Sequence, residues 1–321
     1  MVLQTAFTDL MSVRYPIASA PMGGEAGGAL AAAVANSGGL GLIGAGSGDR
    51  EWLRREADIA RTRTRMPWGI GLLTWAIDVD AVAFALEFEP AAVMLSFGDP
   101  RPFAQRVHDS DAKLILQVTD LDEARRAVDA GADVIVAQGS DAGGHCGQNG
   151  IGTLSFVPAV VDVAGSIPVL AAGGIVDGRG LAAALTLGAA GALIGTRFQA
   201  SHEAIVSAEV SRALLAARGE DTEINRTLDI ARGAPWPSRY PARTLRNAFL
   251  DQWRDRDDEL RADTTAQQEY RAAADHNDLN VVPVWASQAV GLVTTVESAE
   301  DIVAAVVAEA ERALARVSNS R

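Results

Sequence analysis

Eight short runs of apolar residues recur between residues 15 and 198, and each is followed by a stretch rich in alanine or in charge. Each run ends in glycine or polar residues. Strands and helices that alternate in this way are typical of a parallel sheet covered by helices. The runs are YPIASAP (15–21), LGLIGAG (40–46), WGIGLLTW (68–75), AAVMLSFG (91–98), KLILQVTD (113–120), DVIVAQGS (133–140), PVLAAGGI (168–175) and GALIGTRF (191–198).

The runs are apolar almost throughout, which predicts strands buried on both faces. Eight such units of similar length favour a closed (β/α)8 TIM barrel, an α/β fold, over an open doubly wound sheet. Asp or Ser stands at several of the predicted helix starts, where these residues cap the first turn. Helices are predicted over residues 25–37, 50–63, 121–130, 154–164 and 179–187.

The regular alternation ends after Phe198. Residues 201–222 have helical character and precede a stretch that contains proline and tryptophan, GAPWPSRYPAR (233–243). Residues 245–274 are charged and predicted to be helical, and residues 298–317 carry apolar side chains at helical spacing. We interpret the last of these as the helix that closes the barrel.

These patterns predict one barrel with an insertion. A length of 321 residues alone would suggest about two domains, but α/β barrels often form one unit of about 200 to 250 residues. The predicted division is a barrel formed by residues 1–204 and 291–321, with a helical lid of residues 205–290 between them.

Charge and cysteine content limit the function classes. The chain has 28 Lys and Arg against 41 Asp and Glu, a net charge of −13, which disfavours sequence-independent nucleic-acid binding. Its single cysteine, Cys146, allows no internal disulfide and fits a reducing cytoplasm. The N-terminus lacks a signal-peptide pattern, and no apolar run reaches the ~20 residues of a membrane span. We therefore expect a cytoplasmic protein that binds neither nucleic acid nor membrane.

Gly39, Gly41 and Gly44 match the pattern GxGxxG of dinucleotide-binding folds. That pattern indicates a dinucleotide-binding site only where it follows a strand and begins a helix. Here the glycines fall within the second predicted strand, so close packing near the barrel axis is the favoured interpretation.

Glycine-rich turns follow the seventh and eighth predicted strands, the place where barrels often bind phosphate. Backbone N–H groups of Gly173, Gly174, Gly195 and Thr196 could converge on a phosphate, because glycine lets a ligand approach the main chain. The alternative is that these glycines only turn the chain. Two such turns at consecutive positions favour phosphate binding.

The sixth predicted strand runs into VAQGSDAGGHCGQNG (136–150), which holds one histidine among glycines. Gly143, Gly144 and Gly147 remove bulk around His145, as expected where a planar ring system and a small substrate lie against the imidazole. A lone histidine is more often structural, but a position after a barrel strand favours a functional role.

Other groups in this segment are weaker candidates. Cys146 has no Cys-His-Asn pattern around it, and we interpret it as a packing residue. Asp141 and His145 do not make a metal site, because a catalytic zinc needs about three protein ligands and no further His or Cys stands at ligand spacing. No metal is therefore predicted, and the remaining histidines are expected at the surface: His108, His202 and His276.

The chain resembles the nitronate monooxygenases, formerly called 2-nitropropane dioxygenases, over residues 14 to about 203. The combination of AQGxxAGGH, AAGGI and GTRF is specific, although flavin-dependent enoyl-acyl-carrier-protein reductases and NAD(P)H:quinone reductases of the same superfamily share it. The segments that carry the resemblance are PIASAPMGG (16–24), NSGGLGLIGAG (36–46), QVTD (117–120), AQGSDAGGHCG (137–147) and PVLAAGGIVDGRGLAAALTLGAAGALIGTRFQAS (168–201).

The resemblance implies a flavin mononucleotide (FMN) site at the mouth of the barrel. His145 would lie over the flavin and act on the substrate, and Ser201 and Glu203 are weaker candidates for substrate contacts. The third run reads GIGLL, with Gly71 where many relatives have an asparagine that contacts flavin or substrate. The implied cofactor residues are Ala20, Pro21 and Met22 along the isoalloxazine ring, Gln117 and Gln138 near the ring or ribityl chain, Gly143 and Gly144 beside the ring, and Gly173, Gly174, Gly195 and Thr196 at the phosphate.

The resemblance also implies an activity. The enzyme would oxidise alkyl nitronates or nitroalkanes with O2 to carbonyl compounds and nitrite, with His145 as base or as hydrogen-bond donor to the nitro oxygens. The first alternative is an NAD(P)H-dependent flavin reductase acting on an enoyl thioester or quinone. The second is a non-catalytic barrel that binds a phosphate-bearing ligand, because fold does not fix function. The oligomeric state is left open, with a homodimer as one option.

Overall fold

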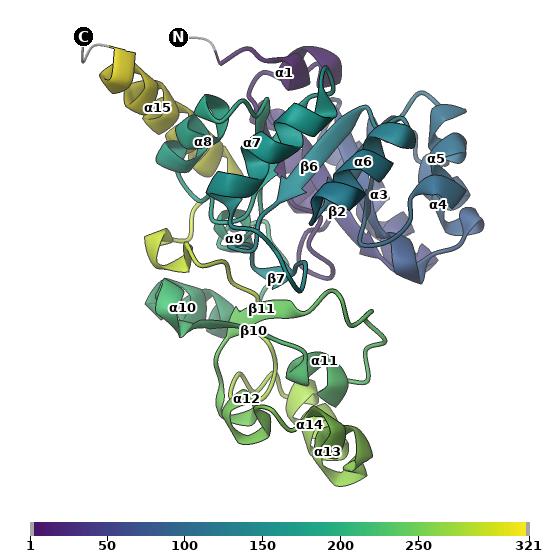
Figure 1. Ribbon diagram of the computed structural model, residues 1–321, viewed down its shortest axis with the longest axis vertical. Helices are drawn as coiled ribbons and strands as arrows, with labels where there is room; N and C mark the ends of the chain where they lie inside the picture. The colour runs from purple at the N-terminus through teal and green to yellow at the C-terminus, as the bar shows by residue number, and fades with distance from the viewer. Residues whose placement is uncertain (1–2, 319–321) are drawn as a thin grey trace.

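The computed structural model describes residues 3–318, and its larger part is a barrel of eight parallel strands surrounded by helices (Figure 1). The backbone N–H of Ser19 donates to the carbonyl of Leu40 (3.0 Å), which joins the two ends of the sheet and closes the ring. The predicted (β/α)8 barrel is confirmed. In sheet order, its strands are β1 (Ile17–Ser19), β9 (Gly191–Ile194), β8 (Val169–Ala172), β6 (Val134–Gln138), β5 (Lys113–Val118), β4 (Ala92–Ser96), β3 (Trp68–Leu73) and β2 (Gly41–Gly46).

Helices cover the outside of the barrel, and several begin where a side chain caps the first turn. Asp49, Asp120 and Asp177 each accept hydrogen bonds from backbone N–H groups of the helix that follows them. All five helices predicted from the sequence are present within a few residues. The outer helices are α2 (Gly28–Asn36), α3 (Arg50–Arg63), α4 (Val79–Leu86), α5 (Arg101–His108), α6 (Leu121–Asp129), α7 (Thr153–Ala164), α8 (Gly178–Thr186) and α15 (Ala299–Ser318).

Two apolar clusters stabilise the barrel. The larger one lies between the strands and the outer helices, and α15 contributes Ile302, Val303 and Val306 to it. The second joins inward-facing side chains such as Met94 to Phe7 of the short helix α1 (Ala6–Met11). Figure 1 places α1 at the end of the barrel away from the smaller unit, so the cavity described below lies at the opposite end.

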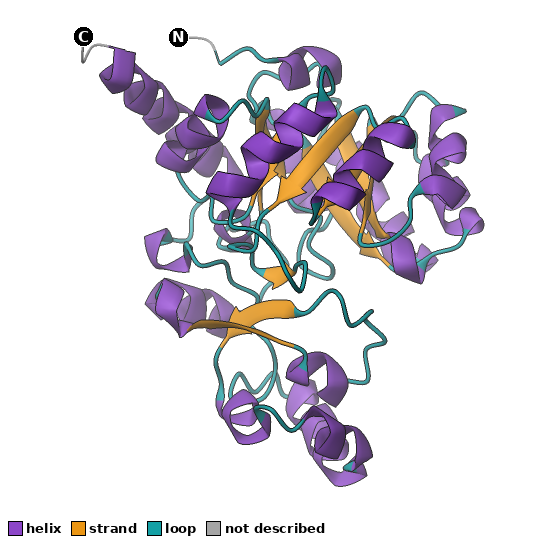
Figure 2. Ribbon diagram, viewed as in Figure 1, coloured by secondary structure: helices purple, strands orange, loops and turns teal. Residues whose placement is uncertain are grey.

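The inserted segment, residues 205–290, forms the smaller unit below the barrel in Figure 2. Its own apolar cluster includes Leu228, Phe249, Trp253 and Tyr270. The proposed boundaries between barrel and lid stay a prediction. The elements of the segment are α10 (Ala208–Ala216), β10 (Thr222–Asn225), α11 (Thr227–Ala231), β11 (Ala242–Leu245), α12 (Ala248–Trp253), α13 (Asp257–Ala262) and α14 (Thr264–Asp275).

The inserted segment differs from the helical lid predicted from the sequence because it also contains two strands. Strands β10 and β11 pair antiparallel, and β11 pairs in turn with the two-residue strand β7 (Gly144–His145) of the barrel. The strand sequences TEIN and ARTL are short and mixed in character, so their pairing depends on tertiary contacts. Residues 201–222 are likewise helical only over α10 and a short terminal turn. Among the described helices, none is long and apolar enough to cross a membrane.

The glycines of the GxGxxG pattern lie in or beside β2 and serve close packing. A Cβ atom on Gly41 would stand 1.9 Å from the carbonyl oxygen of Ala31 in α2, and one on Gly44 would stand 2.3 Å from that of Met22. Real Cβ atoms do not approach backbone this closely. The contacts support the packing interpretation over a dinucleotide site.

We expect Gly41→Ala to lower the free energy of unfolding by about 1–3 kcal/mol, the usual cost of forcing an extra methyl group into a packed core. Equilibrium urea denaturation measures this difference. Gly23→Ala is the matched control, because nothing lies within 4 Å of a Cβ atom at Gly23. Equal unfolding midpoints for the two variants would show that the approach of α2 to β2 does not need a glycine.

Candidate active site

A cavity of about 310 Å³ lies at the carboxyl ends of the barrel strands, next to the inserted segment. The strand ends and the turns after them line it, as expected where a parallel barrel places a ligand. Twelve residues predicted from the sequence line this cavity together: Ala20, Pro21, Met22, Gln117, Gln138, Gly143, Gly144, His145, Gly173, Gly174, Gly195 and Thr196.

The two weaker substrate candidates are not among the residues that line the cavity. Ser201 is buried and forms a bridge to Glu297. The carboxylate of Glu203 accepts a hydrogen bond from the backbone of Ala299, at the start of α15. Both residues therefore fasten the closing helix to the barrel, and the expectation that they contact substrate is not retained.

His145 is held by the inserted segment. It lies on β7 opposite Ala242 of β11, and its Nε2 atom is 2.9 Å from Oδ2 of Asp229 in α11. The side chains of His145 and Asp229 are only 9 % and 8 % exposed. The other oxygen of Asp229 accepts two hydrogen bonds from Arg232, at 2.6 and 3.1 Å. Consecutive hydrogen bonds therefore connect His145 to Asp229 and Asp229 to Arg232.

The electrostatics favour a neutral imidazole beside an ionised carboxylate. Burial lowers the pKa of His145, and this effect outweighs the hydrogen bond and charge of Asp229, which act in the opposite sense. Burial raises the pKa of Asp229, but the hydrogen bonds and charges of His145 and Arg232 together lower it by more. An ionised carboxylate can only accept, so Nε2 carries the hydrogen and Nδ1 keeps the lone pair that a base needs.

Aromatic rings surround the imidazole. The ring of Trp236 stacks on that of His145, with centroids 3.3 Å apart and planes 8° from parallel. Trp285 lies 5.5 Å away, and Phe97 meets the imidazole edge at 6.4 Å. These rings exclude water from the faces of His145, which accounts for the burial that lowers its pKa.

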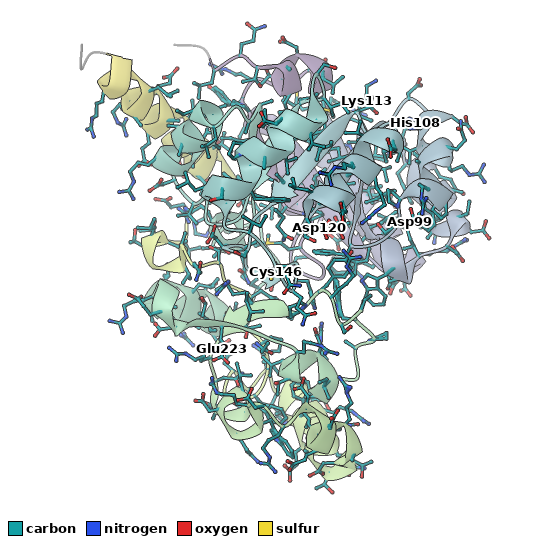
Figure 3. All side chains as sticks on the ribbon, in the orientation of Figure 1. Asp99, His108, Lys113, Asp120, Cys146 and Glu223 are labelled. Atoms are coloured by element: carbon teal, nitrogen blue, oxygen red, sulfur yellow. The ribbon has the colours of Figure 1, made fainter. Side chains whose placement is uncertain are left out.

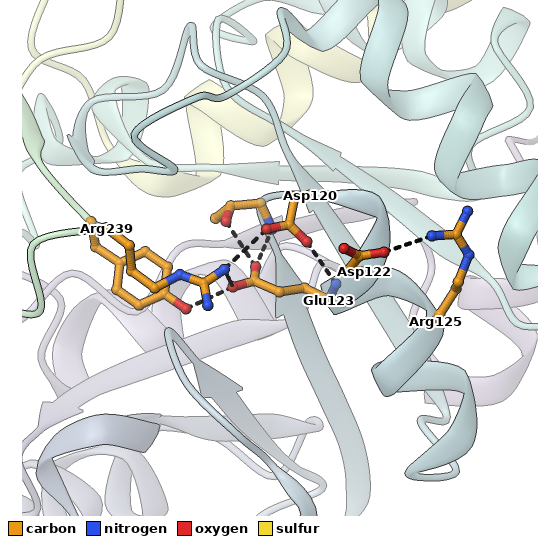
Figure 4. A network of polar contacts seen from close by, with 7 residues as sticks. Asp120, Asp122, Glu123, Arg125 and Arg239 are labelled. Atoms are coloured by element: carbon orange, nitrogen blue, oxygen red, sulfur yellow. Dashed lines mark hydrogen bonds and ion pairs between the residues drawn. The ribbon is translucent and has the colours of Figure 1, made fainter.

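A polar network fastens the loop that carries Trp236 to the barrel. Arg239 bridges Asp120 (3.0 Å) and Glu123 (2.9 Å), both near the start of α6 (Figure 4). The hydroxyl of Tyr240 donates to Glu123 at 2.6 Å, and burial raises the pKa of Tyr240, with a further contribution in the same direction from this carboxylate. The backbone N–H of Thr119 donates to the other oxygen of Glu123. The position of Trp236 over His145 therefore depends on contacts made at α6.

The turns after β8 and β9 form one end of the cavity. Gly173 and Gly174 have φ angles of +103° and +71°, which side-chain-bearing residues rarely adopt. The hydroxyl of Thr196 accepts from the backbone N–H of Ser287, which belongs to the inserted segment. The hydroxyl of Ser287 is itself buried and has no hydrogen-bond partner among the described residues. This end offers backbone and hydroxyl donors to a polar ligand.

Two of the glycines around His145 allow close contacts with other segments of the chain. A Cβ atom on Gly143 would stand 2.5 Å from the carbonyl carbon of Ala286, and one on Gly147 would stand 3.0 Å from Thr119. Only Gly144, with φ +74°, faces open space. Gly71 is required by its neighbour, because a Cβ atom there would lie 2.3 Å from Pro21. A larger residue at position 71 would displace the turn after β1.

Several cavity residues connect side chains that are far apart in sequence. Gln117 donates to the side-chain oxygen of Gln138 (3.2 Å), and Gln138 donates to the carbonyl oxygen of His145 (3.0 Å). Glu25 also lines the cavity, although no sequence motif predicts it, and it accepts a hydrogen bond from Gln199 at 3.1 Å. Burial raises the pKa of Glu25 to about 7.

Cys146 follows β7 at the junction between the barrel and the inserted segment (Figure 3). Its thiol is buried and lies 3.7 Å from the carbonyl oxygen of Pro241. Burial raises the pKa of this thiol to about 11, so it is not a thiolate at neutral pH. Within residues 3–318, no three His, Cys, Asp or Glu side chains are grouped as a metal site would require.

The residues of the inserted segment that surround His145 are not predicted by the sequence patterns. Asp229, Arg232 and Trp285 stand in no recognisable motif. Trp236 lies in the proline- and tryptophan-containing stretch after α11, which was the only signal of a special role.

Comparisons with known proteins agree on one family. The family described as nitronate monooxygenase matches residues 4–80 and 74–309. The chain is similar to a probable nitronate monooxygenase from Staphylococcus saprophyticus, with 33 % identity over 81 % of this chain and 83 % of the other. A second relative, from Staphylococcus aureus strain JH9, is 32 % identical over 90 % and 92 % of the two chains.

Two solved structures are similar along nearly the whole chain. FabK from Thermotoga maritima has a TM-score of 0.86 and 29 % identity, and the match covers 99 % of each chain. A protein described as nitroalkane oxidase from Streptomyces ansochromogenes has a TM-score of 0.82 and 29 % identity, over 98 % of this chain and 100 % of the other. The arrangement of barrel and inserted segment therefore occurs in both of these proteins.

The raised pKa of Glu25 predicts a pH-dependent stability. The carboxyl ionises near its ordinary value of 4.5 in the unfolded chain and at about 7 in the folded one. The unfolded state therefore releases this proton first, and stability falls as pH rises between these values. We expect Glu25→Gln to melt progressively higher relative to the unchanged protein as pH rises from about 4 to about 8. Thermal denaturation across that range, with exposed Glu300→Gln as control, tests this. A difference that does not change with pH would contradict it.

Proposed function

The chain belongs to the nitronate monooxygenase family, and from this premise we propose that it oxidises alkyl nitronates or nitroalkanes with O2 to carbonyl compounds and nitrite, using FMN. Family membership makes it a flavin-dependent oxidoreductase. The observation that carries the finer proposal is the buried contact between His145, which lines the barrel cavity, and Asp229 behind it. A base held in this way is what removal of a proton from carbon requires.

The cavity fits the proposed cofactor. Gly173, Gly174, Gly195 and Thr196 would hold the phosphate through their N–H groups, and the unpartnered hydroxyl of Ser287 offers a further donor. Ala20, Pro21 and Met22, with Gln117 and Gln138, would lie along the ring and ribityl chain, beside Gly143 and Gly144. When bound, the flavin would take electrons from the substrate and pass them to O2.

His145 would move the proton. A nitroalkane carbon is acidic because the nitro group accepts the developing charge, so a neutral imidazole within hydrogen-bond reach can remove its proton. The ionised Asp229 then stabilises the imidazolium that forms, as does the stacked ring of Trp236. The lowered pKa of His145 keeps the base neutral at neutral pH, and protonation below that pKa would stop turnover of neutral nitroalkanes.

Substrates that arrive as anionic nitronates need no base. With these, a His145 protonated on both nitrogens would instead donate a hydrogen bond from Nδ1 to the nitro oxygens, while Nε2 stays bonded to Asp229. Arg232 lines the same cavity and keeps one face toward Trp285, with its guanidinium 5.3 Å from the ring centroid. Its positive charge favours an anionic substrate near His145.

The second candidate is an NAD(P)H-dependent flavin reductase acting on an enoyl thioester or quinone. The observation that favours it is the similarity to FabK over the whole chain, the inserted segment included. The same barrel and the same histidine would serve either reaction.

We expect His145→Asn to retain bound flavin yet lose turnover of a neutral nitroalkane by at least about 100-fold, the lower range for a missing general base. Asp229→Asn should lose part of that activity, because it leaves the imidazole but removes the charge that stabilises its protonated form. Steady-state oxygen consumption measures both variants. His202→Asn, at an exposed histidine outside the cavity, is the matched control. Unchanged turnover in His145→Asn would remove His145 from the mechanism.

Anaerobic reduction separates the two candidate functions. We expect a nitronate to bleach the flavin absorbance of the purified protein and NAD(P)H to do so slowly. Stopped-flow spectroscopy without oxygen measures both rates. Rapid bleaching by NAD(P)H, with none by nitronate, would establish the reductase in place of the monooxygenase.

A further inference from the structure

A second cavity, of about 370 Å³, lies within the inserted segment. It is bordered by α11, by α13 and by the long loop between α11 and β11, which is visible in Figure 1. Its volume falls in the range of small-ligand sites, about 300–1,000 Å³. Trp236 borders this cavity as well as the first one, so the two sites share a wall beside His145. Of the residues that border this cavity and not the first, the proposed oxidation uses Asp229.

Two arginines of this cavity lack a counter-ion. Arg226 is half-buried and Arg261 is exposed at the rim, and neither forms an ion pair or a side-chain hydrogen bond with the described residues. Neighbouring arginines behave differently. Arg254 pairs with Glu223 and Asp251, and Arg256 pairs with Glu259. Although the chain has a net charge of −13, these two guanidinium groups border one cavity without a carboxylate partner among the described residues.

The one carboxylate that lines the cavity cannot neutralise them. Both oxygens of Asp229 are already engaged, one by His145 and the other by Arg232. An anion that pairs with Arg226 and Arg261 in this cavity would therefore be one that the described lining does not supply. Guanidinium groups present paired N–H donors that match the oxygens of phosphate.

The rest of the cavity wall is apolar. Ile230, Pro235 and Pro237 line it, together with Trp236 and Tyr240. Such surfaces bind the organic part of a ligand and do not attract a bare inorganic ion. The wall and the two arginines are thus complementary to a molecule with a charged end and a flat or apolar body.

We propose that this cavity is a second ligand site, which binds an organic phosphate of the nucleotide class through Arg226 and Arg261. The site is separate from the barrel cavity and does not rest on the proposed oxidation. A ligand bound there would contact Trp236, and through this ring it would border the imidazole of His145. Occupancy of the second site is therefore expected to change the fluorescence of Trp236.

The test is isothermal titration calorimetry on the purified protein with its bound flavin, after free flavin has been removed by gel filtration. ADP is the organic probe, and inorganic pyrophosphate is the probe for the charged end alone. We expect ADP to bind, and to bind more tightly than pyrophosphate because only ADP reaches the apolar wall. Equal affinities for the two probes would overturn the assignment of an organic ligand.

Substitution of the two arginines tests whether ADP binds in the second cavity. Arg226→Gln and Arg261→Gln should each weaken ADP binding by at least about tenfold, as expected for loss of a charge-assisted hydrogen bond. Arg271→Gln is the matched control, because it removes the same charge from an exposed position of α14 outside the cavity. Retained flavin absorbance shows that each variant is folded.

Two results would overturn the proposal. One is the absence of binding by ADP and pyrophosphate up to about 10 mM, beyond which an affinity has no specificity. The other is equal weakening by Arg271→Gln, which would mean that ADP responds only to overall charge. A protein without monooxygenase activity can still be titrated, so failure of this proposal is distinguishable from failure of the proposed oxidation.

Discussion

The contact between His145 and Asp229 links the two parts of the molecule on which the cavity depends. The barrel supplies His145 on β7, and the inserted segment supplies Asp229 on α11. Pairing of β7 with β11 sets the backbone register that brings the two side chains together. Without that register the imidazole would have neither a carboxylate at Nε2 nor a tryptophan on its face, and the burial that keeps it neutral would be lost.

Close approaches between backbones explain why glycine occupies so many positions around this contact. Because Gly143 has no side chain, the backbone at Ala286 can pack directly against it. The next residue, Ser287, then donates its backbone N–H to Thr196 at the opposite end of the cavity. Gly71 leaves room for Pro21. The glycines thus act mainly on the fit between segments, because interiors packed at crystal density leave no space for an added methyl group.

The barrel and the inserted segment supply different parts of the cavity lining. The turns after β8 and β9 come from the barrel alone, and in the proposed function they would hold the phosphate of FMN. The aromatic and charged side chains near His145 come from the inserted segment: Asp229, Arg232, Trp236 and Trp285. Proteins described as FabK and as nitroalkane oxidase share this architecture, so differences in substrate are expected to reside in that segment.

The sequence by itself determined the eight strands, the glycine turns that line the cavity and the position of His145, because each depends on residues close together in the chain. Periodicity and turn chemistry are local, and a parallel barrel always gathers its strand ends at one rim. Only the tertiary structure decided that Asp229 meets His145 across 84 residues, and that burial moves the pKa of Glu25. These facts depend on the pairing of short strands without a strong pattern, and on exclusion of water by distant side chains. Neither is encoded in any single stretch of sequence.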